Sequence, residues 1–208
     1  MSVNQSNRKG IVATCLLLVM FSLPLGAQVS DPDADVAPAA PPAEAVPAPD
    51  LQDETELLAA LATADLAESR KFDRQLQALW SKSGSPSLDL LLKRGRDAME
   101  VENTRAAIEH LTALTDHAPD FAEGWHARAS AFFNADLFGP AMADLERALS
   151  LNPNNYNAIY GLGAILETFG DEKRAYEAYK RASDLHPHHE DISKALVRLE
   201  LRVRGKAL

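Results

Sequence analysis

Between residues 54 and 82, apolar side chains recur at the three- and four-residue intervals that place them on one face of a helix. They are Leu57, Leu58, Leu61, Leu66, Phe72, Leu76, Leu79 and Trp80. The pattern is interrupted near Asp65, and the sequence SGSPS at 83–87 is typical of a loop that ends a helix. Residues 54–87 therefore predict two short amphipathic helices followed by a loop.

The next part of the chain repeats with a period of 34 residues, which is the spacing between Pro119, Pro153 and Pro187. A fixed spacing of this size indicates a repeat architecture. Aligning the blocks 88–121, 122–155 and 156–189 brings further residues into register. The columns are Gly95 with Ala129 and Gly163, Ala107 with Ala141 and Ala175, Leu111 with Leu145 and Tyr179, and Leu114 with Ala148 and Ala182.

Each column has a mechanical explanation. The two small-residue columns let the two helices of one block approach closely, while the larger apolar residues fill the space around them. Each proline lacks a backbone N–H and disfavours helical geometry in the residue before it, so a helix ends at this point. Asn154 and Asn155 are suited to cap the helix after Pro153, while Gly170 and Asp171 indicate a turn within the third block. Each block thus predicts a pair of helices.

Together these columns resemble the tetratricopeptide repeat. The second block keeps the pattern almost completely through Trp125, Ala129, Phe132, Ala141, Leu145, Ala148 and Pro153. The first block has Leu114 in place of the second alanine, and the third has Ile159 in place of the tryptophan, both apolar. The resemblance covers residues 88–189 and implies an all-α fold, a right-handed helical solenoid of antiparallel helix pairs.

The ends of such a solenoid need a polar outer cover. Residues 190–208 combine charged residues with the apolar side chains of Ile192, Ala195, Leu196, Leu199 and Leu201, and are predicted to form a C-terminal capping helix. Residues 54–87 are expected to close the other end as an N-terminal helical cap or a degenerate repeat.

In this family the first helices of successive blocks line a concave groove, and the resemblance implies which positions face it. From those positions we take the candidate partner-binding residues Arg96, His126, Ser130, Phe133, Asn134, Asn157, Tyr160 and Glu167. Phe133 and Tyr160 would anchor apolar groups, and the asparagines would contact the backbone of an extended peptide or a helix.

Some family members clamp a C-terminal carboxylate with lysine, asparagine and arginine side chains. The corresponding positions here keep a single positive charge, so this specialisation is not expected. They are Leu92, Arg96, Ala127, Asn157 and Gly161.

In the first 27 residues, Arg8 and Lys9 precede the apolar run IVATCLLLVMFSLPLGA. This order predicts a secretory signal peptide that is cleaved after about Ala27. The run is short for a spanning helix and contains Pro24, so we expect a periplasmic or secreted protein without membrane insertion after cleavage, rather than a retained anchor. Residues 28–53 are rich in proline, alanine and acids and predict a disordered linker.

Charge and cysteine content narrow the classes of function. The formal net charge of −9 becomes more negative by two when Arg8 and Lys9 leave with the signal, and no dense basic block remains, so nucleic acid is not an expected partner. The single cysteine, Cys15, lies in the signal, so the mature chain is predicted to have neither disulfides nor cysteine chemistry.

Sequence motifs for catalysis are missing, since the chain has no HExxH, GxxxxGK[ST] or GxSxG pattern. The stretch HPHHE at 186–190 could ligate zinc or copper, but we interpret it as a solvated loop in which adjacent residues do not converge on one ion. The expected function is a non-enzymatic scaffold or adaptor of the cell envelope that binds a protein or peptide and needs no cofactor or metal. Two alternatives stay open: a metal-handling protein that uses His186, His188 and His189, and an enzyme whose site is assembled from scattered groove residues.

Overall fold

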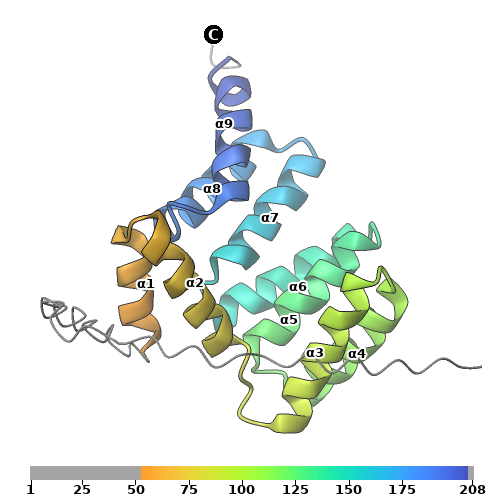
Figure 1. The fold of residues 1–208 in the computed structure, drawn as a ribbon. Coiled ribbons are helices and arrows are strands. Elements are labelled where there is room, and N and C mark those ends of the chain that lie inside the picture. The colour runs from red at the N-terminus through yellow and green to blue at the C-terminus, as the bar shows by residue number, and fades with distance from the viewer. Residues whose placement is uncertain (1–52, 206–208) are drawn as a thin grey trace, which may run out of the picture. The chain divides into compact units, whose positions relative to one another are not determined.

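A computed structural model describes residues 53–205, apart from the side chain of Arg204. The predicted signal peptide and nearly all of the predicted linker lie outside these residues. The described part contains nine α-helices and no strand (Figure 1). The helices are α1 (Glu54–Thr63), α2 (Leu66–Trp80), α3 (Pro86–Glu100), α4 (Thr104–His117), α5 (Ala122–Asn134), α6 (Phe138–Leu151), α7 (Tyr156–Thr168), α8 (Glu172–Leu185) and α9 (Glu190–Gly205). None of these helices is long and apolar enough to cross a membrane.

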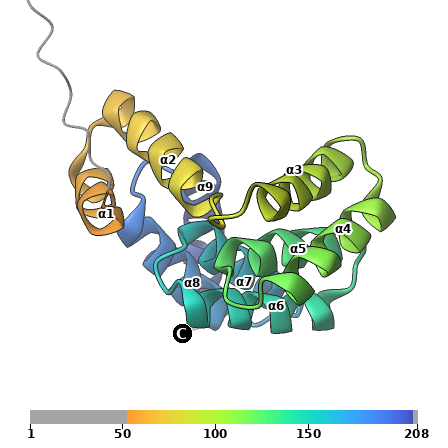
Figure 2. The same ribbon diagram turned by 90° about the horizontal axis from the view of Figure 1, so that it is seen from below.

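The three predicted blocks form the helix pairs α3/α4, α5/α6 and α7/α8. The helices that precede Pro119, Pro153 and Pro187 all end two residues before the proline, as its missing N–H requires. Asn155 caps α7 by accepting hydrogen bonds from the backbone N–H groups of Asn157 and Ala158. The all-α solenoid predicted from the sequence is therefore confirmed, and α3, α5 and α7 follow one another along it (Figure 2).

The helices of a pair approach most closely at the small-residue column. A Cβ atom added to Gly95 would lie 2.5 Å from Leu111, and one added to Gly163 would lie 2.6 Å from the ring of Tyr179. Both distances are far below van der Waals contact, so glycine is required wherever the facing side chain is this close. The second pair has Ala129 at this position, which is buried in the cluster that contains Leu145.

A buried polar cluster joins the second pair to the first. The guanidinium of Arg128 donates two hydrogen bonds to the Asp144 carboxylate, of 2.7 and 2.9 Å, and one of 2.7 Å to the hydroxyl of Thr115 on α4. It also lies over the ring of Trp125, 4.8 Å from the centroid. Because the ion pair is satisfied on both sides, its burial fixes the register between α4, α5 and α6.

The N-terminal pair α1/α2 has the predicted break, with Asp65 capping α2 through hydrogen bonds from Ala67 and Glu68. Its place differs from the expected one, because it does not stack on the first repeat. Instead, its apolar side chains Leu57, Leu61, Leu76 and Trp80 share one core with Tyr156, Ile159, Ala182 and Ile192. The third repeat and α9 have an apolar edge, and the α1/α2 pair covers it (Figure 1). The sequence contains no signal that tells which end of the solenoid this pair covers.

The C-terminal helix α9 packs on α8. Ile192, Ala195 and Leu199 are buried, as their helical spacing requires. Leu201 is the exception, because it is 79% exposed and lies outside the packed face.

We predict that Gly163→Ala destabilises the protein by about 1–3 kcal/mol, because the added methyl group meets the Tyr179 ring. The ring cannot move away freely, since its hydroxyl donates to Glu167 over 3.1 Å. Urea unfolding followed by circular dichroism measures the change in midpoint. Gly139→Ala in α6 is the matched control, because nothing lies within 4 Å of its added Cβ. Equal midpoints for the two variants would contradict the close-packing explanation.

Candidate functional site

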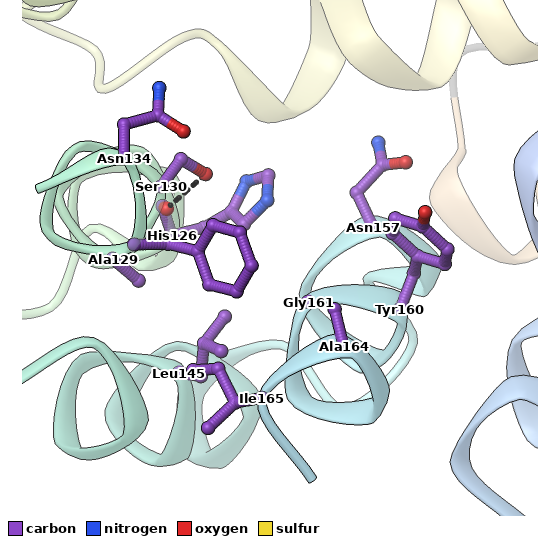
Figure 3. Close-up of a pocket in the computed structure, with 11 residues that line it drawn as sticks. His126, Ala129, Ser130, Asn134, Leu145, Asn157, Tyr160, Gly161, Ala164 and Ile165 are labelled. Carbon is purple, nitrogen blue, oxygen red and sulfur yellow. Dashed lines mark hydrogen bonds between the residues drawn. The ribbon is translucent and has the colours of Figure 1, made fainter. Parts of the chain in front are cut away.

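A pocket of about 340 Å³ opens between α5 and α7 (Figure 3). Of the candidate residues selected from the sequence, it brings together His126, Ser130, Phe133, Asn134, Asn157 and Tyr160. Its remaining lining comes from Ala129, Leu145, Gly161, Ala164 and Ile165. The pocket is thus mainly apolar, with a small number of polar groups, which is the usual character of a ligand site.

Small residues on α7 make room for the pocket. Gly161 has no side chain, and a Cβ placed there would lie 3.4 Å from Leu145. Ala164 follows almost one turn later, so α7 presents a low surface toward α5 (Figure 3). The sequence did not single out Leu145 as a lining residue, because its column indicated only the packing of a helix pair. The gap left by Gly161 is the signal that could have revealed it.

The polar side chains at the pocket differ in whether they already have hydrogen-bond partners within the protein. The hydroxyl of Ser130 donates to the backbone oxygen of His126 over 3.1 Å, so it is used within its own helix. Among the described residues, no partner is found for the side-chain amides of Asn134, which is exposed, or Asn157. These two carboxamides come from opposite sides of the pocket and are available to a ligand (Figure 3).

A buried carboxylate, Glu123, lies behind His126. It accepts hydrogen bonds from the guanidinium of Arg96 and from the amide of Asn155, the latter over 3.2 Å, and its oxygens lie 3.2 and 3.3 Å from Nδ1 of His126. Burial alone would raise the pKa of the Glu123 carboxyl, but the charges and hydrogen bonds of His126 and Arg96 outweigh it and lower the pKa. The carboxylate is therefore ionised and joins α3, α5 and the start of α7.

Arg96 and Glu167 were predicted to contact a partner, but the structure does not place either in the pocket lining. Arg96 bonds to Glu123 and to the hydroxyl of Ser81, the latter over 2.9 Å. Glu167 accepts two hydrogen bonds from Arg198 on α9, of 2.9 and 2.7 Å, and these bonds are the main reason that its pKa is lowered. The charges of Arg96 and Glu167 are thus each paired inside the protein. Neither residue adds an unpaired charge to the pocket.

A row of phenylalanines leads from the pocket to the turns between paired helices. The ring centroid of Phe133 lies 5.4 Å from that of Phe138, which lies 5.8 Å from that of Phe169, both in edge-to-face arrangement. Phe169 is 67% exposed. The sequence did not predict this row, because Phe138 begins α6 and Phe169 follows α7, both outside the aligned groove positions.

The histidine cluster near residue 186 departs from the expected solvated loop. His186 is buried, with its ring edge-on to Tyr156 at 5.0 Å between centroids, and its Nε2 lies 3.9 Å from the carboxylate of Asp73 on α2. The Tyr156 hydroxyl donates to the same carboxylate. His188 instead lies 3.0 Å from the backbone oxygen of Ala64. His186 is buried because α1/α2 docks over it, which the sequence could not indicate, whereas His188 is exposed.

Metal binding by this cluster finds no support in its geometry. Within the described residues, no group of three or more His, Cys, Asp or Glu side chains is placed so that it could hold a metal ion. His186 faces Asp73 and Tyr156, while His188 is directed to the chain end of α1. The two imidazoles therefore serve the contact with the N-terminal pair.

Stacked helix pairs with a pocket between their first helices define an α-helical repeat protein. Residues 122–155 match the family model described as tetratricopeptide repeat. A TPR repeat-containing protein of Rhizobium etli is 30% identical over 113 residues, which are 54% of this chain and 55% of that protein. The human protein SGT1 homolog is 33% identical over 88 residues, 38% of this chain and 24% of that protein. The chain thus spans about half of the first relative and less of the second.

Solved structures show the same fold. The first TPR domain of Spaghetti (RPAP3), bound to the HSP90 peptide SRMEEVD, superposes with a TM-score of 0.54 at 23% identity, over 56% of this chain and 93% of that one. MamA superposes with a TM-score of 0.53 at 24% identity, over 66% of this chain and 82% of that one. Residues 122–155 are thus matched as a tetratricopeptide repeat, and the three in-phase helix pairs of residues 86–185 have the fold of such repeats.

We predict that docking of α1/α2 weakens in acid because of His186. Burial lowers the pKa of its imidazole, and His188 and His189 act in the same direction, while Asp73 opposes them. The unfolded chain takes up this proton near the ordinary histidine pKa of about 6.5. Below that pH the unfolded state binds more protons than the folded one, so the free energy of unfolding falls as the pH falls.

The measurement is the urea midpoint of wild type and His186→Phe between about pH 7.5 and 5.5, a range centred on the ordinary histidine pKa. Wild type is expected to lose more stability over this range than the variant, in which the titrating group is replaced by an apolar ring. The same loss in both proteins would contradict this role of His186.

Proposed function

We propose that this protein is a non-enzymatic interaction module that holds a segment of another protein in the pocket between α5 and α7. The observation that carries the proposal is the open apolar pocket, whose rim has two carboxamides with no partner among the described residues. Phe133 and Tyr160 supply the apolar surface, and Asn134 and Asn157 can each pair with a backbone N–H and C=O. This combination suits a peptide or a helix better than a small charged metabolite.

The charge distribution supports an apolar anchor rather than a charged one. Arg96 is engaged by Glu123, and Glu167 is engaged by Arg198, so no excess charge points at the pocket from these residues. The phenylalanine row from Phe133 to Phe169 extends the apolar surface beyond the pocket. A partner segment could therefore place one apolar side chain in the pocket and continue over Phe169.

Structural neighbours favour a peptide ligand in general but not the same ligand. The RPAP3 domain is bound to the HSP90 peptide SRMEEVD, and the TPR2B domain of yeast Sti1 has been solved in complex with an Hsp70 peptide. In this chain the positions expected to clamp a terminal carboxylate include Leu92, Ala127 and Gly161, which offer no charge. We therefore expect an internal segment of the partner to bind, not a free C-terminus.

The setting that we propose is the cell envelope. This part of the proposal rests on the sequence alone, namely the apolar run that ends near Ala27 and the proline-rich, acidic stretch that follows it. In this arrangement residues 28–53 act as a tether, and the repeats act as a scaffold or adaptor for an envelope protein.

We predict that the full chain captures a partner from envelope extract, and that Phe133→Ala combined with Tyr160→Ala reduces capture by at least about tenfold. Truncation of central apolar residues that line a binding pocket commonly costs more than about 1 kcal/mol each. Affinity capture with mass spectrometry measures the yield. Leu201→Ala is the matched control, because this leucine is 79% exposed and lies on α9, away from the pocket.

Two results would contradict the proposal. Unchanged capture by the double variant would exclude the pocket as the binding site. Equal recovery of the same partner with the control chain and with an unrelated helical protein would show that capture is nonspecific.

A further inference from the structure

The side of the pocket formed by α5 contains a polar group that the general peptide-binding role does not explain. His126 lines the pocket, and its side chain is 16% exposed. Nδ1 is directed to the carboxylate of Glu123, at 3.2 and 3.3 Å from its two oxygens. Among the described residues no partner is found for Nε2, and this atom is not sealed from solvent.

The contact with Glu123 decides which ring nitrogen carries the proton. An ionised carboxylate can only accept hydrogen bonds, so the nitrogen that faces it must be the protonated one. Arg96 and Asn155 donate to the same carboxylate and keep it ionised despite its burial. Nδ1 of His126 is therefore the N–H donor, and in the neutral imidazole Nε2 presents a bare lone pair.

Around this lone pair the pocket is mainly apolar. Leu145 and Ile165 lie below, and Ala129 and Ala164 lie on the facing helices (Figure 3). The hydroxyl of Ser130 is committed to the backbone oxygen of His126 and is not a partner for Nε2. A purely aliphatic group in the pocket would remove water from Nε2 without replacing its hydrogen bond, which costs binding free energy.

We infer that the pocket selects an aromatic side chain that carries an N–H donor, the indole of a tryptophan, with the indole N–H donating to Nε2 of His126. The indole has a large apolar surface for Phe133 and Tyr160 and a single donor with no acceptor. Its polarity complements the lone pair, because the indole N–H can only donate and the lone pair can only accept. This inference rests on the proposed function and specifies its ligand.

The experiment compares three blocked heptapeptides that differ only in the central residue, which is tryptophan, benzothienylalanine or leucine. Benzothienylalanine keeps the shape of the indole and replaces the N–H with sulfur. Titration into the full chain is followed by heteronuclear NMR, which measures weak dissociation constants. The tryptophan peptide is expected to bind roughly 3- to 10-fold more tightly than the benzothienylalanine peptide, the range of one net hydrogen bond, and the leucine peptide is expected to bind most weakly.

The same titrations with His126→Leu separate the hydrogen bond from the shape of the pocket. The variant is expected to bind the tryptophan and benzothienylalanine peptides equally well. Asn134→Ala is the matched control, because this amide lies at the rim and should leave the ratio between the two peptides unchanged. Far-ultraviolet circular dichroism and the urea midpoint check that each variant is folded.

The outcomes distinguish the two proposals. Equal affinity of wild type for the tryptophan and benzothienylalanine peptides, or tightest binding of the leucine peptide, would overturn the inference while peptide binding stands. A ratio that persists in His126→Leu would also overturn it. If none of the peptides shifted resonances of the pocket residues, the peptide-binding function would fail together with the inference.

Discussion

The close approach of two helices within each repeat is the constraint on which the remaining structure depends. Gly163 lies against the ring of Tyr179 and Gly95 against the side chain of Leu111, at distances that leave no room for a Cβ atom. This contact sets the distance between the helices of a pair, and the prolines then set where the next pair begins. The space between α5 and α7 is a consequence of both, because each of these helices is held by its own partner and the small residues Gly161 and Ala164 of α7 line the space.

Polar contacts around Glu123 hold neighbouring helices together beside the pocket. Glu123 draws Arg96, His126 and Asn155 to one buried carboxylate and so joins three repeats at the side of the pocket. The same contact places the N–H of the neutral imidazole on Nδ1, so Nε2 of His126 adds a hydrogen-bond acceptor to a mainly apolar pocket. Glu123 and His126 therefore contribute both to the packing of the repeats and to the polarity of the pocket. Arg96, which the sequence predicted as a ligand contact, holds Glu123 in place.

The sequence predicted the parts that repeat and missed the parts that do not. Columns such as Gly95, Ala129 and Gly163 report a constraint that recurs in each pair, so the helix pairs, their ends and the groove-facing side chains from Ser130 to Tyr160 could be predicted. The docking of α1/α2 on α7–α9 could not, since its apolar face would suit either end of the solenoid. The burial of His186 and the ion pairs of Arg96 and Glu167 depend on contacts between distant segments, which periodicity does not reveal.

Filling the pocket between α5 and α7 tests whether this protein holds its partner there. Ala164→Leu adds three carbon atoms to a residue of α7 that lines the pocket (Figure 3). The measurement is the affinity of this variant for the captured partner or for the tryptophan peptide, with its urea midpoint determined in parallel. We expect a loss of binding of at least about tenfold with the fold retained. Full binding by a folded Ala164→Leu variant would show that the partner does not bind in this pocket.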